Sequence, residues 1–292
     1  MKISVIIPIY NVALYVEECL RSVLEQDYED LEIIIVDDCG TDNSMELVEN
    51  MVFNSSRDIS ILRHHSNKGL SAARNTGIRQ ATGDYLFFLD SDDYIEPYCL
   101  SCLAQIAGIY PEADMVYGSS KAIPERPIPE DIVSRIDLNV FYDDRRKIKK
   151  MILSYSLLPI GIWNRLIKRK WLLEYQLFFK EGIVYEDNHW DFFAAKCVRR
   201  IALCKKNIHY YRFNPNGISY TQFHKRLESK DIILKDWVKN LDCCCLSSQL
   251  YAILHLAHTC YVMRFGGESR PPYIRAFYPF IYLTRFFLLY YK

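Results

Sequence analysis

The chain has 292 residues, half of them apolar, enough for a sizeable core in one large domain or in a core domain with an appendage. Its 36 basic and 36 acidic residues give a formal net charge of zero, so no global positive field would attract nucleic acid. The opening MKISVIIPIYN has only a short apolar run broken by Pro8, which is too short for a secretory signal and predicts a cytosolic chain. Ten cysteines contain one CxxC pair and no second pair to complete a zinc site, so we expect reduced thiols.

Apolar runs alternate with helical patterns through the first 118 residues. The runs predict strands over 3–10, 31–38, 59–64, 84–89 and 113–118. Helical spacing predicts helices over 13–26, 45–52 (capped by Asp42 or Ser44), 70–81 and 97–109. Such alternation is typical of βαβ units, so we expect an α/β fold with a mainly parallel central sheet flanked by helices.

The rest of the chain carries weaker patterns. Residues 119–150 include KAIPERPIPED, whose three prolines predict an extended surface connection between two halves of a domain. We expect a helix at 162–172 that carries Asn164, Arg165 and Lys168, although KRK can simply be a solvated face. Further helices are expected over 223–241 and 247–265.

Three acidic residues, Asp90, Asp92 and Asp93, follow the apolar run YLFFL directly. Like charges so close resist ionising together, so something positive should lie among them. In an open parallel sheet, ligands bind beyond the carboxyl ends of the strands, where Asn11 and Asp38 would also lie. Mg²⁺ or Mn²⁺ suits these oxygen ligands, and Mg²⁺ usually takes one or two protein carboxylates and fills its shell with water and phosphate oxygens. The pattern therefore predicts a divalent cation and a phosphate-bearing substrate, although some of these residues can simply form turns and caps.

Four stretches of the first half, SVIIPIYN, IIIVDDCGTDNS, NKGLSAARNTGI and GDYLFFLDSDD, resemble the family 2 glycosyltransferases, which have the glycosyltransferase A-type, nucleotide-diphospho-sugar transferase fold. Residues 162–172, 184–192 and 208–219 resemble the acceptor-side half of that family, so the resemblance spans about 3–220. It implies a glycosyltransferase domain over 1–220, with a nucleotide-sugar half at 1–118 and an acceptor and base half at 119–220. Residues 221–292 would form a helical, aromatic-rich C-terminal extension.

The resemblance also implies which residues hold the donor. Asp38 would hydrogen-bond the base, most often uracil in this family, and Arg74 would approach the base or the diphosphate. Asp90 would contact the ribose or the sugar, and Asp92 would bind Mn²⁺ or Mg²⁺, with Asp93 sharing either task. The other residues expected in the nucleotide-sugar pocket are Pro8, Tyr10, Asn11, Lys68, Gly69 and Ser91.

Asp187 in YEDNHW matches the family's general base, with Glu186 beside it. From the residues alone, Asp187 can instead be the N-cap of a helix that presents Trp190 and Phe193 on one face. His189 could contact the acceptor or the diphosphate, or be structural. Asn164, Arg165 and Lys168 of the expected helix would face the acceptor or the donor phosphates.

The sequence thus predicts a metal-dependent inverting glycosyltransferase, either a hexosyl- or an N-acetylhexosaminyltransferase. It would move one sugar from a nucleoside-diphosphate sugar, with UDP expected, to a glycan or lipid-linked saccharide, as in surface polysaccharide biosynthesis. The alternative is a non-catalytic nucleotide-sugar or glycan-binding protein on the same fold. A pyrophosphorylase or a dehydrogenase would need glycines after the first strand, where this chain has PIYNVALY. A processive synthase would carry several membrane spans.

The tail at 271–292 is aromatic and basic. Pro279 and two internal arginines, Arg275 and Arg285, argue against a membrane-spanning helix. We expect either a helix lying at the inner face of the cell membrane, with arginines on anionic headgroups, or an amphipathic helix docked on the domain or at a dimer contact.

Overall fold

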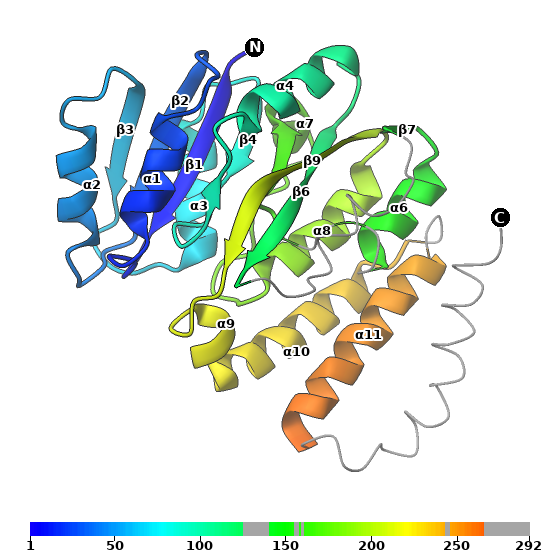
Figure 1. Cartoon of the computed structure of the whole chain (residues 1–292). Helices are drawn as coiled ribbons and strands as arrows, with labels where there is room; N and C mark the ends of the chain where they lie inside the picture. The colour runs from blue at the N-terminus through cyan, green and yellow to red at the C-terminus, as the bar shows by residue number, and fades with distance from the viewer. Residues whose placement is uncertain (125–139, 155–157, 159–160, 243–245, 266–292) are drawn as a thin grey trace.

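The structure is a computed structural model that describes residues 1–124, 140–154, 158, 161–242 and 246–265. Its first half contains four parallel strands joined by three helices (Figure 1). The expected strands and helices of this half are confirmed, but the expected cap of α2 is wrong, because Asn43 rather than Asp42 or Ser44 takes the N-cap position. Their bounds are β1 Ile3–Ile9, α1 Val16–Leu24, β2 Leu31–Asp37, α2 Ser44–Val52, β3 Asp58–Arg63, α3 Leu70–Gln80 and β4 Tyr85–Phe88.

The chain after β4 contributes strands of 2 to 12 residues and most of the helical mass. Its elements are β5 Tyr94–Ile95, α4 Cys99–Ile109, β6 Met115–Ile123, β7 Phe141–Tyr142, α6 Arg145–Leu153, β8 Arg165–Lys168, α7 Arg169–Glu174, α8 Glu186–Cys197, β9 Ile201–Arg212, α9 Ile218–Thr221, α10 Phe223–Lys239 and α11 Leu246–Phe265. The helices expected over 223–241 and 247–265 are therefore confirmed.

All strands join one sheet in the order β3-β2-β1-β4-β8-β6-β9-β5, with β7 paired to β9. The parallel character belongs to β1 to β4 and to the β6–β9 pair, whereas β8 runs antiparallel to both of its neighbours. The α/β class is thus confirmed, in a mixed sheet.

The helix expected over 162–172 is wrong in its first part. Residues 165–168 form β8, because a backbone placed between β4 and β6 can satisfy its hydrogen bonds on both sides. A helix, α7, begins only at Arg169.

Helices cover both faces of the sheet, and the side chains of each strand alternate between them. Ile3, Val5 and Ile7 of β1 pack with α1, α2 and α4, whereas Ile6 packs with the core under α3, α6 and α8. Gly77 lets α3 approach β1 closely, because a Cβ at this position would lie 2.4 Å from Ile6 Cγ2.

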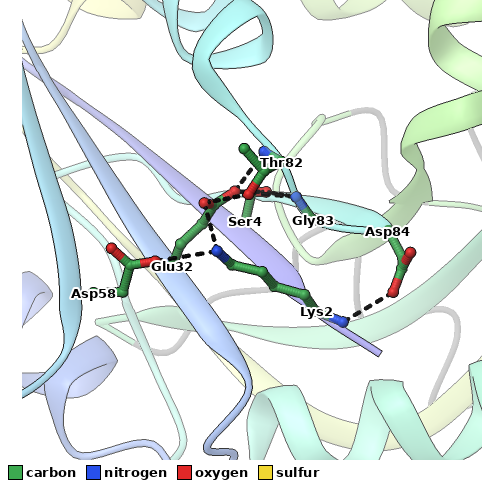
Figure 2. Close-up of polar contacts among 7 residues, drawn as sticks. All are labelled: Lys2, Ser4, Glu32, Asp58, Thr82, Gly83 and Asp84. Atoms are coloured by element: carbon green, nitrogen blue, oxygen red, sulfur yellow. Dashed lines mark hydrogen bonds and ion pairs between the residues drawn. The ribbon is translucent and has the colours of Figure 1, made fainter.

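A buried carboxylate, Glu32, joins β1, β2 and the turn before β4 at the amino ends of the strands (Figure 2). Glu32 Oε1 accepts hydrogen bonds from Ser4 Oγ at 2.5 Å and from Thr82 N at 2.6 Å, and Lys2 Nζ lies 2.9 Å from Oε2. Burial alone would raise the pKa of Glu32, but these hydrogen bonds lower it to about 2. This cluster lies at the end of the sheet opposite to the predicted ligand site and has a structural role.

The helices after residue 220 pack on the sheet domain. Trp237 of α10 stacks on Phe192 of α8 with ring centroids 4.8 Å apart, and Ser229 Oγ accepts a hydrogen bond from Val184 N. Helix α11 packs on α10 and α6.

Within the described residues no helix is long and apolar enough to cross a bilayer, and every described cysteine is a free thiol. The tail at 271–292 lies outside the described residues.

Candidate functional site

A cavity of about 820 Å³ opens at the carboxyl ends of β1, β2 and β4 and is closed on its far side by α8 and by the segment from the end of β9 into α10. It gathers residues from widely separated parts of the chain. All but one of the predicted site residues line it: Pro8, Tyr10, Asn11, Asp38, Lys68, Gly69, Arg74, Asp90, Ser91, Asp92 and Asp187. The exception is Asp93.

Asp38 holds the loop before α3. The backbone N–H of Lys68 donates to Asp38 Oδ1 at 2.8 Å, and that of Gly69 donates to Oδ2 at 2.7 Å. His64 Nδ1 lies 2.6 Å from Oδ1. Gly69 has a φ of +88°, a backbone that a side chain disfavours. With these contacts made, one lone pair of Oδ2 is left for a ligand.

Asn11 shapes the turn after β1. Its φ is 52°, in the left-handed region that asparagine tolerates. Its Oδ1 accepts hydrogen bonds from Thr41 N at 2.7 Å and Asp42 N at 3.3 Å, so the turns after β1 and β2 are tied together beneath the cavity. These bonds use the side-chain oxygen, and Asn11 itself lines the cavity.

The three aspartates after β4 differ in their surroundings. Asp90 and Asp92 line the cavity, and Asn214 Nδ2 donates to Asp92 Oδ2 at 2.9 Å. Burial, together with the charges of Asp93 and Asp90, raises the pKa of Asp92 to about 7. A carboxylate whose ionisation is so disfavoured gains most from a nearby cation.

Asp93 lies behind the cavity wall, with 1% of its surface exposed. Its Oδ1 accepts a hydrogen bond from Arg212 N at 2.7 Å, and His209 Nε2 lies 3.2 Å from its Oδ2. Burial raises the pKa of Asp93 well above its usual value. The structure thus turns this carboxylate toward β9, whereas Asp92 faces the cavity.

Asp187 lies in the first turn of α8 and lines the cavity together with Glu186 and Asn188. Helix α8 begins at Glu186, and Tyr185, with a left-handed backbone, takes the cap position. The N-cap reading of Asp187 is therefore wrong; its Oδ1 accepts a hydrogen bond from the next backbone N–H, at Asn188. Burial and the charge of Glu186 raise the pKa of Asp187 to about 8. A carboxylate with a pKa near neutrality is suited to proton transfer.

Several residues considered from the sequence lie away from the cavity wall. Asn164 and Arg165 are fully buried; Asn164 Nδ2 donates to Ser120 Oγ, and Arg165 Nη1 lies 2.8 Å from Asp191 Oδ1. Lys168 donates to the carbonyl of Pro111. The expectation that these three face the acceptor or the donor phosphates is wrong, because β8 runs through the middle of the sheet. His189 Nε2 lies 3.3 Å from Asp236 of α10 and is also outside the lining.

Trp163, Tyr185 and Lys225 also line the cavity, and the sequence assigned them no role. Tyr211 and Arg212, which the sequence suggested either close over the donor diphosphate or pack as aromatics, line it as well, and Trp163 stacks near Tyr211 with ring centroids 5.7 Å apart. The asparagine-rich turn NPNGIS, with Asn214, carried a local signal of turn chemistry.

A family model described as Glycosyl transferase family 2 matches residues 4–175. "Uncharacterized glycosyltransferase EpsJ" from Bacillus subtilis (strain 168) is 31% identical over 220 residues, which are 74% of this chain and 62% of EpsJ. "Glycosyltransferase GlyA" from Streptococcus pneumoniae is 31% identical over 226 residues, 75% of this chain and 31% of GlyA. The chain thus spans between about a third and two thirds of the length of these relatives.

Solved structures with the same fold include S. aureus TarS 1–349 in complex with UDP-GlcNAc, with a TM-score of 0.71, 22% identity, and coverage of 94% of this chain and 75% of that one. Mannosyltransferase PcManGT from Pyrobaculum calidifontis, in complex with GDP-Man and Mn²⁺, has a TM-score of 0.60 and 17% identity, with 97% and 80% covered. At these identities the likeness concerns the fold.

Proposed function

Because this chain belongs to glycosyl transferase family 2, we propose that it is a metal-dependent inverting glycosyltransferase that moves one sugar from a nucleoside-diphosphate sugar to a saccharide acceptor. One observation carries the proposal. Asp92, after a buried strand, and Asp187, in the first turn of α8 with its pKa raised to about 8, line the same cavity. A nucleotide-sugar placed between them would have its diphosphate near the first and an acceptor hydroxyl near the second.

The donor would lie over the turns after β1, β2 and β4. The free lone pair of Asp38 can accept a hydrogen bond from a base N–H, as uracil offers, and Tyr10 offers an aromatic face beside it. Lys68 lines the same wall and makes no ion pair within the described part of the chain, so its charge is available to the diphosphate. The UDP and UDP-GlcNAc complexes of TarS support UDP as the nucleotide.

The oxygen ligands that Asp92 and its neighbours offer fit Mn²⁺ or Mg²⁺. Among the described residues no group of three or more His, Cys, Asp or Glu could hold a metal alone. Mg²⁺ characteristically takes one or two protein carboxylates with phosphate oxygens and water, and Asp92 and Asp90 offer these carboxylates at the cavity wall. A bound cation would stabilise the negative charge that develops on the leaving diphosphate. Asp93, turned to β9, would fix the strand end that carries Asp92.

Asp187 would act as the general base. It would take the proton of the acceptor hydroxyl while that oxygen attacks C1 of the sugar from the face opposite the diphosphate. The C1–O bond to the acceptor forms as the C1–O bond to the diphosphate breaks, through a transition state like an oxocarbenium ion. One displacement inverts the configuration at C1, and no covalent enzyme intermediate is required.

The acceptor would enter past Tyr185, Lys225 and Trp163, whose rings and charge suit a saccharide. We propose a glycan or a lipid-linked saccharide, and a transferred hexose or N-acetylhexosamine. We also propose that residues 1–118 bind the donor, 119–220 bring the base and acceptor wall, and 221–292 form the helical extension. Membrane association would rest on 271–292, as the aromatic and basic pattern of that sequence favours.

A screen of nucleotide sugars by thermal unfolding, with Mn²⁺ and with chelator, tests donor binding. A ligand at 100 times its Kd stabilises the fold by about 2.7 kcal/mol, so one sugar nucleotide should raise the melting temperature clearly and only with metal. A non-catalytic binding protein would show the same shift. It differs from an enzyme because it would release no nucleoside diphosphate from the bound donor during long incubation with acceptors.

A further inference from the structure

Arg74 joins carboxylates from two distant parts of the sequence. Its Nη2 lies 2.5 Å from Asp90 Oδ1, and its Nη1 lies 2.5 Å from Glu186 Oε1. The arginine is 2% exposed, and its guanidinium carbon lies 5.3 Å from the centroid of the Phe179 ring. Burial opposes its charge, but Asp90 and Glu186 hold the pKa of Arg74 above its usual value, so it stays a cation.

We propose that Arg74 is a positioning residue that ties the start of α8, and with it Asp187, to the donor end of β4. A planar guanidinium fixes two carboxylates in distance and direction, which an ammonium group cannot do. The distance between base and leaving group would then be set by one side chain. The catalytic meaning of this tie rests on the proposed function, whereas the tie itself does not.

A direct role of Arg74 on the diphosphate fits the geometry less well. Each terminal nitrogen already donates to a carboxylate, and with the side chain 2% exposed little of the guanidinium is open to a phosphate. Lys68 and Lys225 line the cavity without an ion pair within the described ranges, so cations remain for the phosphates. Arg74 also engages Glu186, which would leave Asp187 as the carboxylate free to take a proton.

The same tie would set the charge balance at Asp187. The charged groups around Asp187 come from several elements: Glu186 and Asp191 of α8, Arg74 of α3, Arg165 of β8, and the cavity-lining Asp90, Asp92 and Lys225. Arg74 lowers the pKa of Asp187, against burial and the charge of Glu186, which raise it. Removing Arg74 would therefore raise this pKa further.

Three variants separate position from charge. Arg74→Met removes both, Arg74→Lys keeps the charge without the planar fork, and Arg74→Met combined with Glu186→Gln removes one cation and one anion together. Arg79→Met is the matched control, since Arg79 lies on the solvent side of the same helix. If Arg74→Met fails to fold because Glu186 is left buried without a cation, the other two variants carry the test.

The first measurement is the carboxylate titration of Asp187 by ¹³C NMR, with the signal assigned by Asp187→Asn. We expect Arg74→Met to raise the pKa of Asp187 by about one unit or more. Arg79→Met should leave it unchanged, and the double variant should bring it back toward the wild-type value. An unchanged pKa in Arg74→Met would overturn the proposal. The titration needs no turnover, so it tests the positioning role even in a protein that transfers no sugar. Absence of sugar transfer by the wild type would refute the proposed function instead.

The second measurement compares kcat for transfer with the Kd of UDP. Misplacing a reacting group by about 1 Å can cost on the order of 10²-fold in rate, so kcat should fall by that order in Arg74→Lys and in the double variant. The Kd of UDP should stay close to that of wild type in both. A large rise in that Kd with kcat preserved at saturating donor would show that Arg74 binds the diphosphate and would refute the positioning role.

Discussion

Replacing Asp187 by asparagine should remove proton abstraction and leave the fold intact. Asparagine keeps the size of the neutral carboxyl group, and the side-chain oxygen can still accept from Asn188 N. Because burial raises the pKa of Asp187 to about 8, the protonated form is the one that the fold favours. The stability that this protonated carboxyl adds to the fold is complete below the unfolded-state pKa of about 4 and is lost as pH rises to about 8. The variant should therefore gain stability over wild type through this range, by roughly 1 kcal/mol or more.

The rate of transfer should respond in the opposite sense. Loss of a general base costs about 10²- to 10⁴-fold, so the asparagine variant should transfer sugar that much more slowly while its donor affinity stays close to that of wild type. The wild-type rate should rise with pH and level off near the pKa of Asp187, about 8 in the free protein. The assays are donor titration, transfer rate from pH 5 to about 9, and urea unfolding, with the exposed Asp143→Asn as control. Near-normal transfer by the asparagine variant would refute the assignment, and Glu186→Gln would then be tested.

Three further outcomes are expected. Glu32→Gln should lower the free energy of unfolding by about 1.5 to 3 kcal/mol at pH 7, because it removes the hydrogen bonds that the ionised Glu32 carboxylate accepts. The control Glu29→Gln, at an exposed position, should leave that free energy unchanged. The loss in Glu32→Gln should vanish as pH falls from about 4.5 toward 2, where Glu32 becomes protonated in the fold; a loss independent of pH would contradict this. Asn214→Ala should raise the Kd for Mn²⁺ with UDP about tenfold or more, because Asp92 loses the hydrogen bond from Asn214 Nδ2 that favours its ionised form. An unchanged metal affinity would refute that role of Asn214. Deleting 271–292 should stop pelleting with anionic vesicles while turnover of a short soluble acceptor survives, and continued pelleting would exclude the tail as the anchor.

The donor half of the fold was predictable because its strands are buried on both faces. Such strands appear as continuous runs of isoleucine and valine, as in ISVIIPI and LEIII, and polar residues mark their ends. β8 was missed because RLIK within a basic stretch fits a helical pattern equally well. Its pairing with β4 and β6 is a tertiary effect that its own four residues do not encode.

The same limit applies to the site. Ten of the residues predicted to bind the donor or the metal line the cavity, as does Asp187. They were predictable because strand ends and family motifs mark them. The sequence could not separate Asp92 from Asp93, because the turn after β4 decides which carboxylate faces the cavity and which faces β9. The pairing of Arg74 with Glu186, 112 positions away, also depends on the fold alone.

Release of nucleoside diphosphate from the donor identified by the screen tests the central claim most directly. Wild type and Asp92→Ala would be incubated with that nucleotide-sugar and a panel of saccharide acceptors, with Mn²⁺ and with chelator. We predict metal-dependent release coupled to an inverted glycosidic product for wild type. We predict none for Asp92→Ala, whose fold should persist because the change removes no buried apolar area. Release that is equal with chelator, or equal in Asp92→Ala, would contradict the account.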